Sequence, residues 1–159
     1  MNLNENLFFE IKSLGNFLKI EVLNLVNENS ELDWDNNWIN CKIYVSGGAF
    51  SGNYSAEIMT FEFEKFKHDL NSLYENLNGT AEFQDIENYI IVKVKGDGIG
   101  HFNAEIICFD YPGIDSAKLE FEIYFDQTFI KEIVNQLNQI TKEFPITGDF
   151  KIQNNYNVN

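Results

Sequence analysis

The sequence predicts an α+β fold in which an antiparallel meander sheet carries two amphipathic helices packed on one face. Segments with alternating apolar and polar residues recur along the chain and indicate strands that are buried on one side. Most connections between these segments are short, which favours antiparallel neighbours. Two segments with apolar residues three and four positions apart indicate helices, and each has a single apolar stripe that a sheet would cover.

The N-terminal strands are expected to include a hairpin. Alternating residues occur over positions 18–22 and again over positions 39–46. The pair Gly47-Gly48 then indicates a tight turn into an extended segment, residues 50–59. The two segments that flank this turn are therefore expected to pair antiparallel.

The apolar spacing changes to that of a helix after Thr60. Thr60 is expected to be the N-cap, and Glu62 lies in the first turn, where the helix dipole favours an acid. Gly79 lies just beyond the end, where a left-handed residue would stop the helix. The apolar stripe consists of Phe63, Phe66, Leu70, Leu73 and Leu77.

Further strands are predicted at regular spacing over residues 80–84, 89–95, 101–110 and 118–125. A second helix is predicted to begin after Asp126 and to be stopped by Pro145. Its apolar stripe is formed by Ile130, Ile133, Val134, Leu137, Ile140 and Phe144. Both helices are expected to cover the same face of the sheet and to leave the other face open.

The length and composition are those of one folded domain. A chain of 159 residues can form one hydrophobic core, and a hydrophobic fraction of 44% supplies the residues to fill it. No repeat or proline-rich linker divides the chain. We therefore expect a single α+β domain over residues 1–150, followed by an Asn-rich tail over residues 151–159 that frays.

The chain is strongly acidic. Its 25 acidic and 11 basic residues give a formal charge of −14, which repels nucleic acid and anionic membrane surfaces. A basic protein is the partner that this charge favours, because complementary fields raise association rates. Acidity that serves solubility alone is the alternative, and charge does not separate the two.

Two features of the sequence predict a cytoplasmic protein. Residues 1–10 carry acids rather than the basic and apolar regions of a signal peptide, and no apolar run approaches the roughly 18–20 residues that span a bilayer. Cys41 and Cys108 both lie in apolar, strand-like runs, where a thiol behaves as a small hydrophobic group. A disulfide framework is therefore not expected.

No motif predicts a metal site. His68 and His101 have no further histidine or cysteine at ligand spacing. Residues 33–38 resemble the start of a calcium loop, but Trp38 and Tyr44 stand where glycine and glutamate are needed. The segment is instead expected to form a turn in which Asp and Asn side chains bond local backbone.

No motif predicts a cofactor or a catalytic residue either. The GxGxG segment at residues 96–100 joins two predicted strands, so it lacks the helix N-terminus that phosphate sites use and is expected to be a hairpin turn. Glu120 and Glu122 share a strand face at a separation compatible with acid–base catalysis. Their position on an open sheet favours a solvated face instead, and no serine stands in a nucleophile elbow.

The open face of the predicted sheet is the candidate binding surface. It mixes acids with aromatic and aliphatic groups, as protein interfaces do. The residues predicted to bind a protein partner are Glu82, Glu105, Phe109, Glu120, Glu122 and Tyr124. Alternatively, the N-terminal segment or a second copy of the chain covers this face. A homodimer is therefore a further possibility.

Several short motifs follow one another along most of the chain. They are Asp35-Asn36-Asn37-Trp38-Ile39, the helix Phe61 to Leu77 with the following Gly79-Thr80-Ala81-Glu82-Phe83, Gly98-Ile99-Gly100-His101, Phe125-Asp126-Gln127-Thr128-Phe129 and Phe144-Pro145-Ile146. In their order the chain resembles the WapI-like family of bacterial immunity proteins, which neutralise the toxic C-terminal domains of wall-associated or contact-dependent toxins. The resemblance implies a non-enzymatic cytoplasmic inhibitor that binds a cognate toxin domain, often a nuclease.

Two other functions stay open at this point. One is a homodimeric regulatory or scaffold domain that binds another protein. The other is an enzyme that uses Glu120 and Glu122, or His101, as its catalytic groups.

Overall fold

The computed structural model describes residues 6–32 and 34–148, and in them the strands form two four-stranded antiparallel sheets. The N-terminal sheet has the order β1-β2-β3-β4, with β1 at Leu7–Ser13, β2 at Asn16–Leu25, β3 at Trp38–Gly47 and β4 at Phe50–Met59. The C-terminal sheet has the order β5-β6-β7-β8, with β5 at Asn78–Gln84, β6 at Ile90–Asp97, β7 at His101–Phe109 and β8 at Lys118–Asp126. The helices are η1 at Asp35–Asn37, α1 at Thr60–Asn76 and α2 at Gln127–Glu143.

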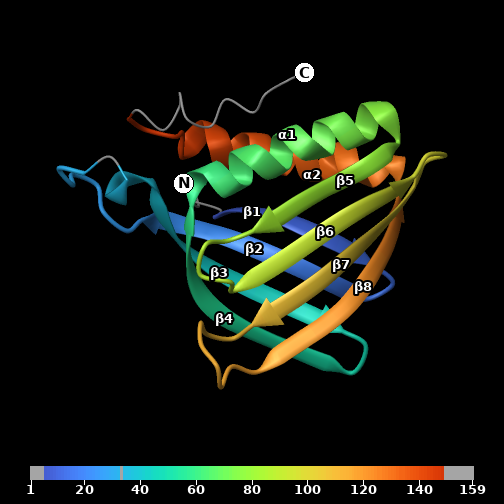
Figure 1. Cartoon of the computed structure of the whole chain (residues 1–159), viewed down its shortest axis with the longest axis horizontal. Helices are drawn as coiled ribbons and strands as arrows, with labels where there is room; N and C mark the ends of the chain where they lie inside the picture. The colour runs from blue at the N-terminus through green and yellow to red at the C-terminus, as the bar shows by residue number, and fades with distance from the viewer. Residues whose placement is uncertain (1–5, 33, 149–159) are drawn as a thin grey trace, which may run out of the picture.

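The α+β class is confirmed, but the single meander sheet with both helices on one face is not. The strands of the two sheets cross one another in Figure 1, and α1 and α2 lie together at one end of the sheets. Each sheet has one apolar face, and the two apolar faces cover each other. The helices pack instead along the edge strands, α1 against β5 and α2 against β1.

The first strand, β1, was not predicted. Phe9 and Ile11 point into the core and alternate with Glu10 and Lys12, which is a strand pattern. The strand pairs with β2 through a turn at Leu14 and Gly15, both of which have positive φ, as tight hairpin turns require. The predicted tail over residues 151–159 lies outside the described residues.

Both ends of α1 differ from the prediction. Met59 is the N-cap, while Thr60 is the first helical residue and donates its hydroxyl hydrogen to Asn37 Oδ1 at 3.3 Å. The residue in the left-handed conformation is Leu77, with φ of 60°, and Gly79 already belongs to β5. Because β5 starts at the next residue, the chain must reverse direction at Leu77 itself. The predicted start of α2 after Asp126 is confirmed, and the Asp126 side chain caps the helix by accepting from the Thr128 N–H.

Four phenylalanine rings join α1 to the edge strands of both sheets. Phe9 of β1 lies 5.5 Å from Phe83 of β5, measured between ring centroids, and 5.6 Å from Phe66 of α1. Phe63 of α1 lies 5.3 Å from Phe83. All four rings are fully buried, and most of these pairs meet edge to face, as aromatic rings prefer. This aromatic cluster closes the end of the core between the sheets.

The cluster gives a stability prediction. Phe66→Ala should lower the free energy of unfolding by about 3–5 kcal/mol, because it leaves a cavity between α1, β1 and β5. Phe121→Ala on β8 should cost less, since that ring is only half-buried. Urea unfolding of both variants measures this, and a larger loss for Phe121→Ala would contradict the assignment of the core centre.

A second prediction tests the packing of one sheet on the other. A methyl group built at Gly47 of β3 would lie 2.7 Å from Phe121 Cγ on β8, which is closer than carbon atoms approach in proteins. Gly47→Ala should therefore destabilise the chain by about 1–3 kcal/mol. Gly52→Ala on β4 is the matched control, because its methyl group would meet nothing within 4 Å. Equal unfolding midpoints in urea for the two variants would rule out this contact.

Candidate partner-binding surface

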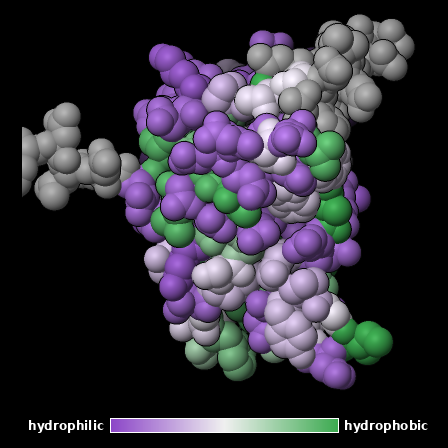
Figure 2. All heavy atoms as spheres, turned by 90° about the vertical axis from the view of Figure 1, so that its left-hand side faces the viewer, coloured by the Kyte–Doolittle hydropathy of each residue, from purple (hydrophilic) through white to green (hydrophobic). Residues whose placement is uncertain are grey.

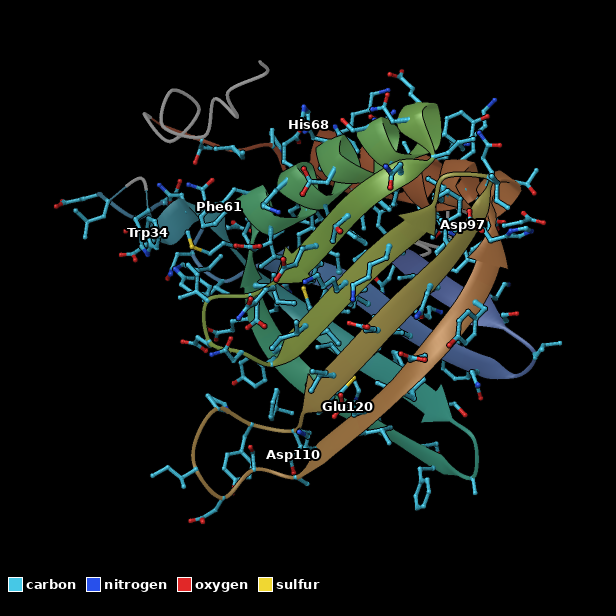
Figure 3. All side chains as sticks on the ribbon, turned by 45° about the vertical axis from the view of Figure 1, so that its right-hand side comes forward. Trp34, Phe61, His68, Asp97, Asp110 and Glu120 are labelled. Carbon is cyan, nitrogen blue, oxygen red and sulfur yellow. The ribbon has the colours of Figure 1, made fainter. Side chains whose placement is uncertain are left out.

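The structure places all six predicted partner-binding residues on the solvent side of the C-terminal sheet, called here the outer face. Glu82 comes from β5, Glu105 and Phe109 from β7, and the remaining three residues, Glu120, Glu122 and Tyr124, from β8. The strand register aligns Glu82, Lys93, Glu105 and Glu122 in one row across the sheet. Figure 3 shows Glu120 on β8, near the end of the sheet opposite Asp97. Antiparallel pairing thus brings together residues that lie far apart in the sequence.

The outer face is less acidic than the chain as a whole. Its glutamates share it with Lys93, Lys95 and Lys118. Lys95 Nζ lies 3.1 Å from Glu105 Oε1, and Lys118 Nζ lies 3.5 Å from Glu120 Oε2. These exposed ion pairs contribute little to stability. Because lysines and glutamates are present in similar numbers, the net charge of the outer face is small.

Aromatic groups supply the apolar part of the outer face. The Tyr124 ring is 62% exposed, and its hydroxyl donates to Glu122 Oε2 at 2.7 Å. This hydrogen bond and the negative charge of Glu122 raise the pKa of Tyr124. Phe109 is half-buried and lines a hollow of about 320 Å³ at one end of the sheet, together with Ile91 and Tyr111. The hollow could receive an apolar side chain of a partner.

A second recess, called here the acid pocket, was not predicted. It lies between the start of α1 and the end of β5 and has a volume of about 500 Å³. Its lining consists of Glu62, Lys65, Glu82, Gln84, Asp85, Ile86 and Asn88. In Figure 1 these parts of α1 and β5 lie on the left-hand side, and Figure 2 views the molecule from that side, where hydrophilic residues predominate.

The acid pocket arises because α1 covers the free edge of β5. Lys65 Nζ donates to the backbone oxygen of Glu82 at 3.3 Å, and the Glu62 carboxylate lies near the backbone N–H of Gln84, which lowers the pKa of Glu62. The Lys65 bond satisfies a backbone group that an edge strand would otherwise leave unpaired. The β1 edge of the N-terminal sheet is covered in a similar way, since Gln136 of α2 accepts from the Glu10 N–H of β1 at 2.9 Å.

Two carboxylates of the acid pocket are buried. The pKa of Glu62 is raised to about 7, mainly by burial; Lys65 lowers it, and the nearby carboxylates of Asp85 and Glu82 raise it. Asp85 is 2% exposed, and its Oδ1 accepts from the Ile90 N–H at 2.9 Å. The other oxygen, Asp85 Oδ2, is buried without a hydrogen-bond partner. Burial likewise raises the pKa of Asp85, while backbone N–H groups of the following turn oppose the shift.

The two histidines considered for catalysis or metal binding each lie beside a nearby aspartate. His101 Nδ1 lies 2.8 Å from Asp97 Oδ2, and Asp97 Oδ1 also accepts from the Ile99 N–H, so both residues close the β6–β7 turn. These bonds lower the pKa of Asp97, the Ile99 N–H most of all. Residues 96–100 form this hairpin turn, as predicted. His68 lies on α1 (Figure 3), with Nδ1 3.5 Å from Asp69 Oδ1.

The segment that resembles a calcium loop forms a turn stabilised by its own side chains. Asn36 Oδ1 accepts from the Ser30 N–H at 2.9 Å, and Asn36 Nδ2 donates to the Ser30 oxygen at 3.0 Å. Trp34 packs on Phe61 at 5.9 Å between ring centroids, and both are labelled in Figure 3. Asp33 lies outside the described residues. Across residues 6–32 and 34–148, no group of three or more His, Cys, Asp or Glu side chains is placed to hold a metal ion.

Cys41 and Cys108 are buried and carry free thiols. Burial raises the pKa of both thiols, to about 12 for Cys108. Within the described residues, no helix is long and apolar enough to cross a membrane.

Comparison with known proteins identifies the family. Residues 8–145 match the WapI-like family of immunity proteins. The chain belongs to this family. The match spans β1 to the end of α2, so it includes the outer face and the acid pocket of this WapI-like chain. No curated protein matches the sequence.

Among solved structures, the WapI-like chain is distantly similar to three proteins of other descriptions. MRP1/MRP2 of Trypanosoma brucei is 9% identical, with a TM-score of 0.47 over 88% of this chain and 86% of that chain. WHY1 of Arabidopsis thaliana is 12% identical, with a TM-score of 0.48 over 97% and 92%. The plant transcriptional regulator PBF-2 is 14% identical, with a TM-score of 0.46 over 96% of each. Similarities this remote carry no conclusion about function.

Glu62 gives a pH-dependent stability prediction. Its pKa is about 7 in the folded chain against an ordinary 4.5, so its ionisation opposes folding increasingly from pH 4.5 to 7 and fully above. Glu62→Gln should therefore raise the free energy of unfolding by about 1–3 kcal/mol at pH 8 and leave it unchanged at pH 4. Urea unfolding at both pH values measures this.

The control for this prediction is Glu64→Gln in the same turn of α1. Glu64 lies at the surface, 2.9 Å from Lys67 Nζ. The Glu64→Gln variant should show no gain in the free energy of unfolding at pH 8. A gain for Glu62→Gln that is equally large at pH 4 would contradict the buried, ionised carboxylate.

Proposed function

We propose that the chain is a non-enzymatic immunity protein of the cytoplasm that binds a cognate toxin domain through the outer face and thereby neutralises it. Membership of the WapI-like family over residues 8–145 is the observation that carries this proposal. A toxin that acts inside the cell requires its inhibitor in the same compartment, which supports the cytoplasmic location.

The outer face is preferred over the solvent side of the N-terminal sheet because its aromatic groups are available. On the N-terminal sheet, Lys19 Nζ lies 4.4 Å from the centroid of Phe8 and 5.9 Å from that of Tyr44, so the lysine covers both rings. On the outer face, Tyr124 stays exposed and Phe109 lines a hollow. Exposed aromatic groups inside a charged rim are typical anchors of protein interfaces.

Charge supports a basic toxin domain as the partner. A net charge of −14 raises the rate of encounter with a positively charged protein. A nuclease is the toxin class that this charge suits best, because a surface that binds phosphates is basic. The same charge disfavours nucleic acid as a direct partner of the chain.

The experiment is co-expression of the chain with the toxin domain encoded immediately upstream of it. The proposal expects rescue of growth and a complex that co-purifies. Rescue without a complex would overturn binding as the mechanism. Sedimentation of the isolated chain adds a second check, because a stable dimer that buries the outer face would overturn that face as the toxin site.

The outer face is tested by charge reversal. Glu120→Lys/Glu122→Lys should slow association with a basic toxin about three- to tenfold at low salt and much less at high salt, since exposed charges are screened. Glu132→Lys/Glu143→Lys on the exposed side of α2 is the matched control with the same change in net charge. Stopped-flow or surface-binding kinetics measure the rates. Equal slowing by both double variants would mean that net charge alone, and not this face, sets the rate.

A further inference from the structure

We propose that the acid pocket binds a basic side chain of the partner protein, an arginine guanidinium in preference to a lysine ammonium. The inference rests on the proposed function, because it takes the partner to be a basic toxin domain. It adds a defined recess to the binding surface and names the chemical group that enters it.

The pocket has an excess of carboxylates over cations. Glu62, Glu82 and Asp85 face it, whereas Lys65 is its cationic side chain among the lining residues. Lys65 Nζ lies 2.7 Å from Asp69 Oδ2, outside the pocket lining, and also bonds the Glu82 backbone oxygen. Its positive charge is therefore largely compensated elsewhere, and the pocket carboxylates keep an uncompensated negative charge.

The unpartnered oxygen of Asp85 is the observation that points to a ligand. Asp85 is 2% exposed, and its Oδ2 makes no hydrogen bond although it is buried. A buried acceptor without a donor costs about 1–3 kcal/mol, and more when it is charged. Asp85 lines the pocket, so a rotation of its carboxylate would bring Oδ2 to a donor placed there and would remove this cost. Glu62, which α1 holds on the opposite wall, would gain from the same positive charge.

The pocket suits a guanidinium better than a metal ion. No group of three or more His, Cys, Asp or Glu side chains in the described segments is arranged as metal ligands. A guanidinium offers five donors in a plane and can reach separated carboxylates, which a compact ion cannot. At the rim, Ile86 is 50% exposed and offers an apolar surface for the stem of an arginine side chain.

Binding should depend on pH because Glu62 must be ionised. The charged groups that face Glu62 are Lys65 from its own helix and Glu82 and Asp85 from β5 and the turn after it. With a pKa of about 7, Glu62 is about nine-tenths ionised at pH 8 and about one-tenth ionised at pH 6. A cation that pairs with Glu62 should therefore bind more weakly at pH 6, by up to about tenfold.

The test is an NMR titration of the full chain with N-acetylarginine methylamide at pH 8 and pH 6. The same titration with the citrulline analogue gives a neutral control of the same shape, and calcium chloride gives a metal control. The expected result is a saturable shift of the backbone amides at residues 62, 82, 85 and 88 with the arginine compound alone, weaker at pH 6. No saturable shift, an equal shift with citrulline, or a shift with calcium instead would each overturn the proposal.

Variants locate the binding. Glu82→Gln should weaken arginine binding about tenfold, as loss of a charged hydrogen-bond partner does, and Asp85→Asn should do so if it folds. Glu132→Gln/Glu143→Gln on the exposed side of α2 should leave arginine binding unchanged. If arginine fails to bind while the toxin still co-purifies with the chain, the acid pocket is wrong and the immunity function stands. If arginine binds but no toxin complex forms, the proposed function fails alone.

Discussion

Cover of the free sheet edges is the constraint on which the rest of this structure depends. The two four-stranded sheets have four edge strands, β1, β4, β5 and β8, and the unpaired backbone groups of an edge strand invite association with other chains. The helices pack against two of these edges, β1 and β5. The helices solve this at one end of the molecule. Apolar rings from α1, β1 and β5 exclude water, and Lys65 and Gln136 bond the backbone of β5 and β1. A cost follows, because a carboxylate that reaches the β5 backbone has to be buried, and its pKa rises accordingly.

Local features of the fold could be predicted from the sequence, and its layering could not. Alternation places Phe121 and Ile123 of β8 on the inner face, and the structure agrees. What covers that face is not a local property: α1 separates the two meanders in the chain, and the sheets pack on each other instead of on the helices. The same limit applies to Leu77, which adopts the left-handed conformation although Gly79 is nearby, because β5 begins at once. Its carbonyl accepts from the Gly98 N–H at 2.9 Å, a contact from a distant turn.

The candidate site divides in the same way. The six outer-face residues could be placed because a strand fixes which side chains share a face. The balance of charge on that face could not be predicted, because Lys95 and Glu105 come together only through the pairing of β6 with β7. The acid pocket could not be predicted from the spacing of apolar and polar residues in the sequence. Glu62 has the position of a first-turn acid and Asp85 that of a turn residue, and both descriptions are correct. Only the packing of α1 on β5 buries them.

Glu82 connects the two candidate surfaces. It belongs to the row of charged residues across the outer face and also lines the acid pocket, so one partner could contact both without a gap. The physical character of the two contacts differs. Exposed carboxylates such as Glu120 and Glu122 act at long range and are screened by salt, whereas a cation that contacts the buried carboxylates of the pocket would be screened less. The pocket would respond instead to pH near 7, through Glu62. If the partner binds as proposed, salt would act on the outer face and on the rate of encounter, whereas pH would act on the pocket and on the lifetime of the complex.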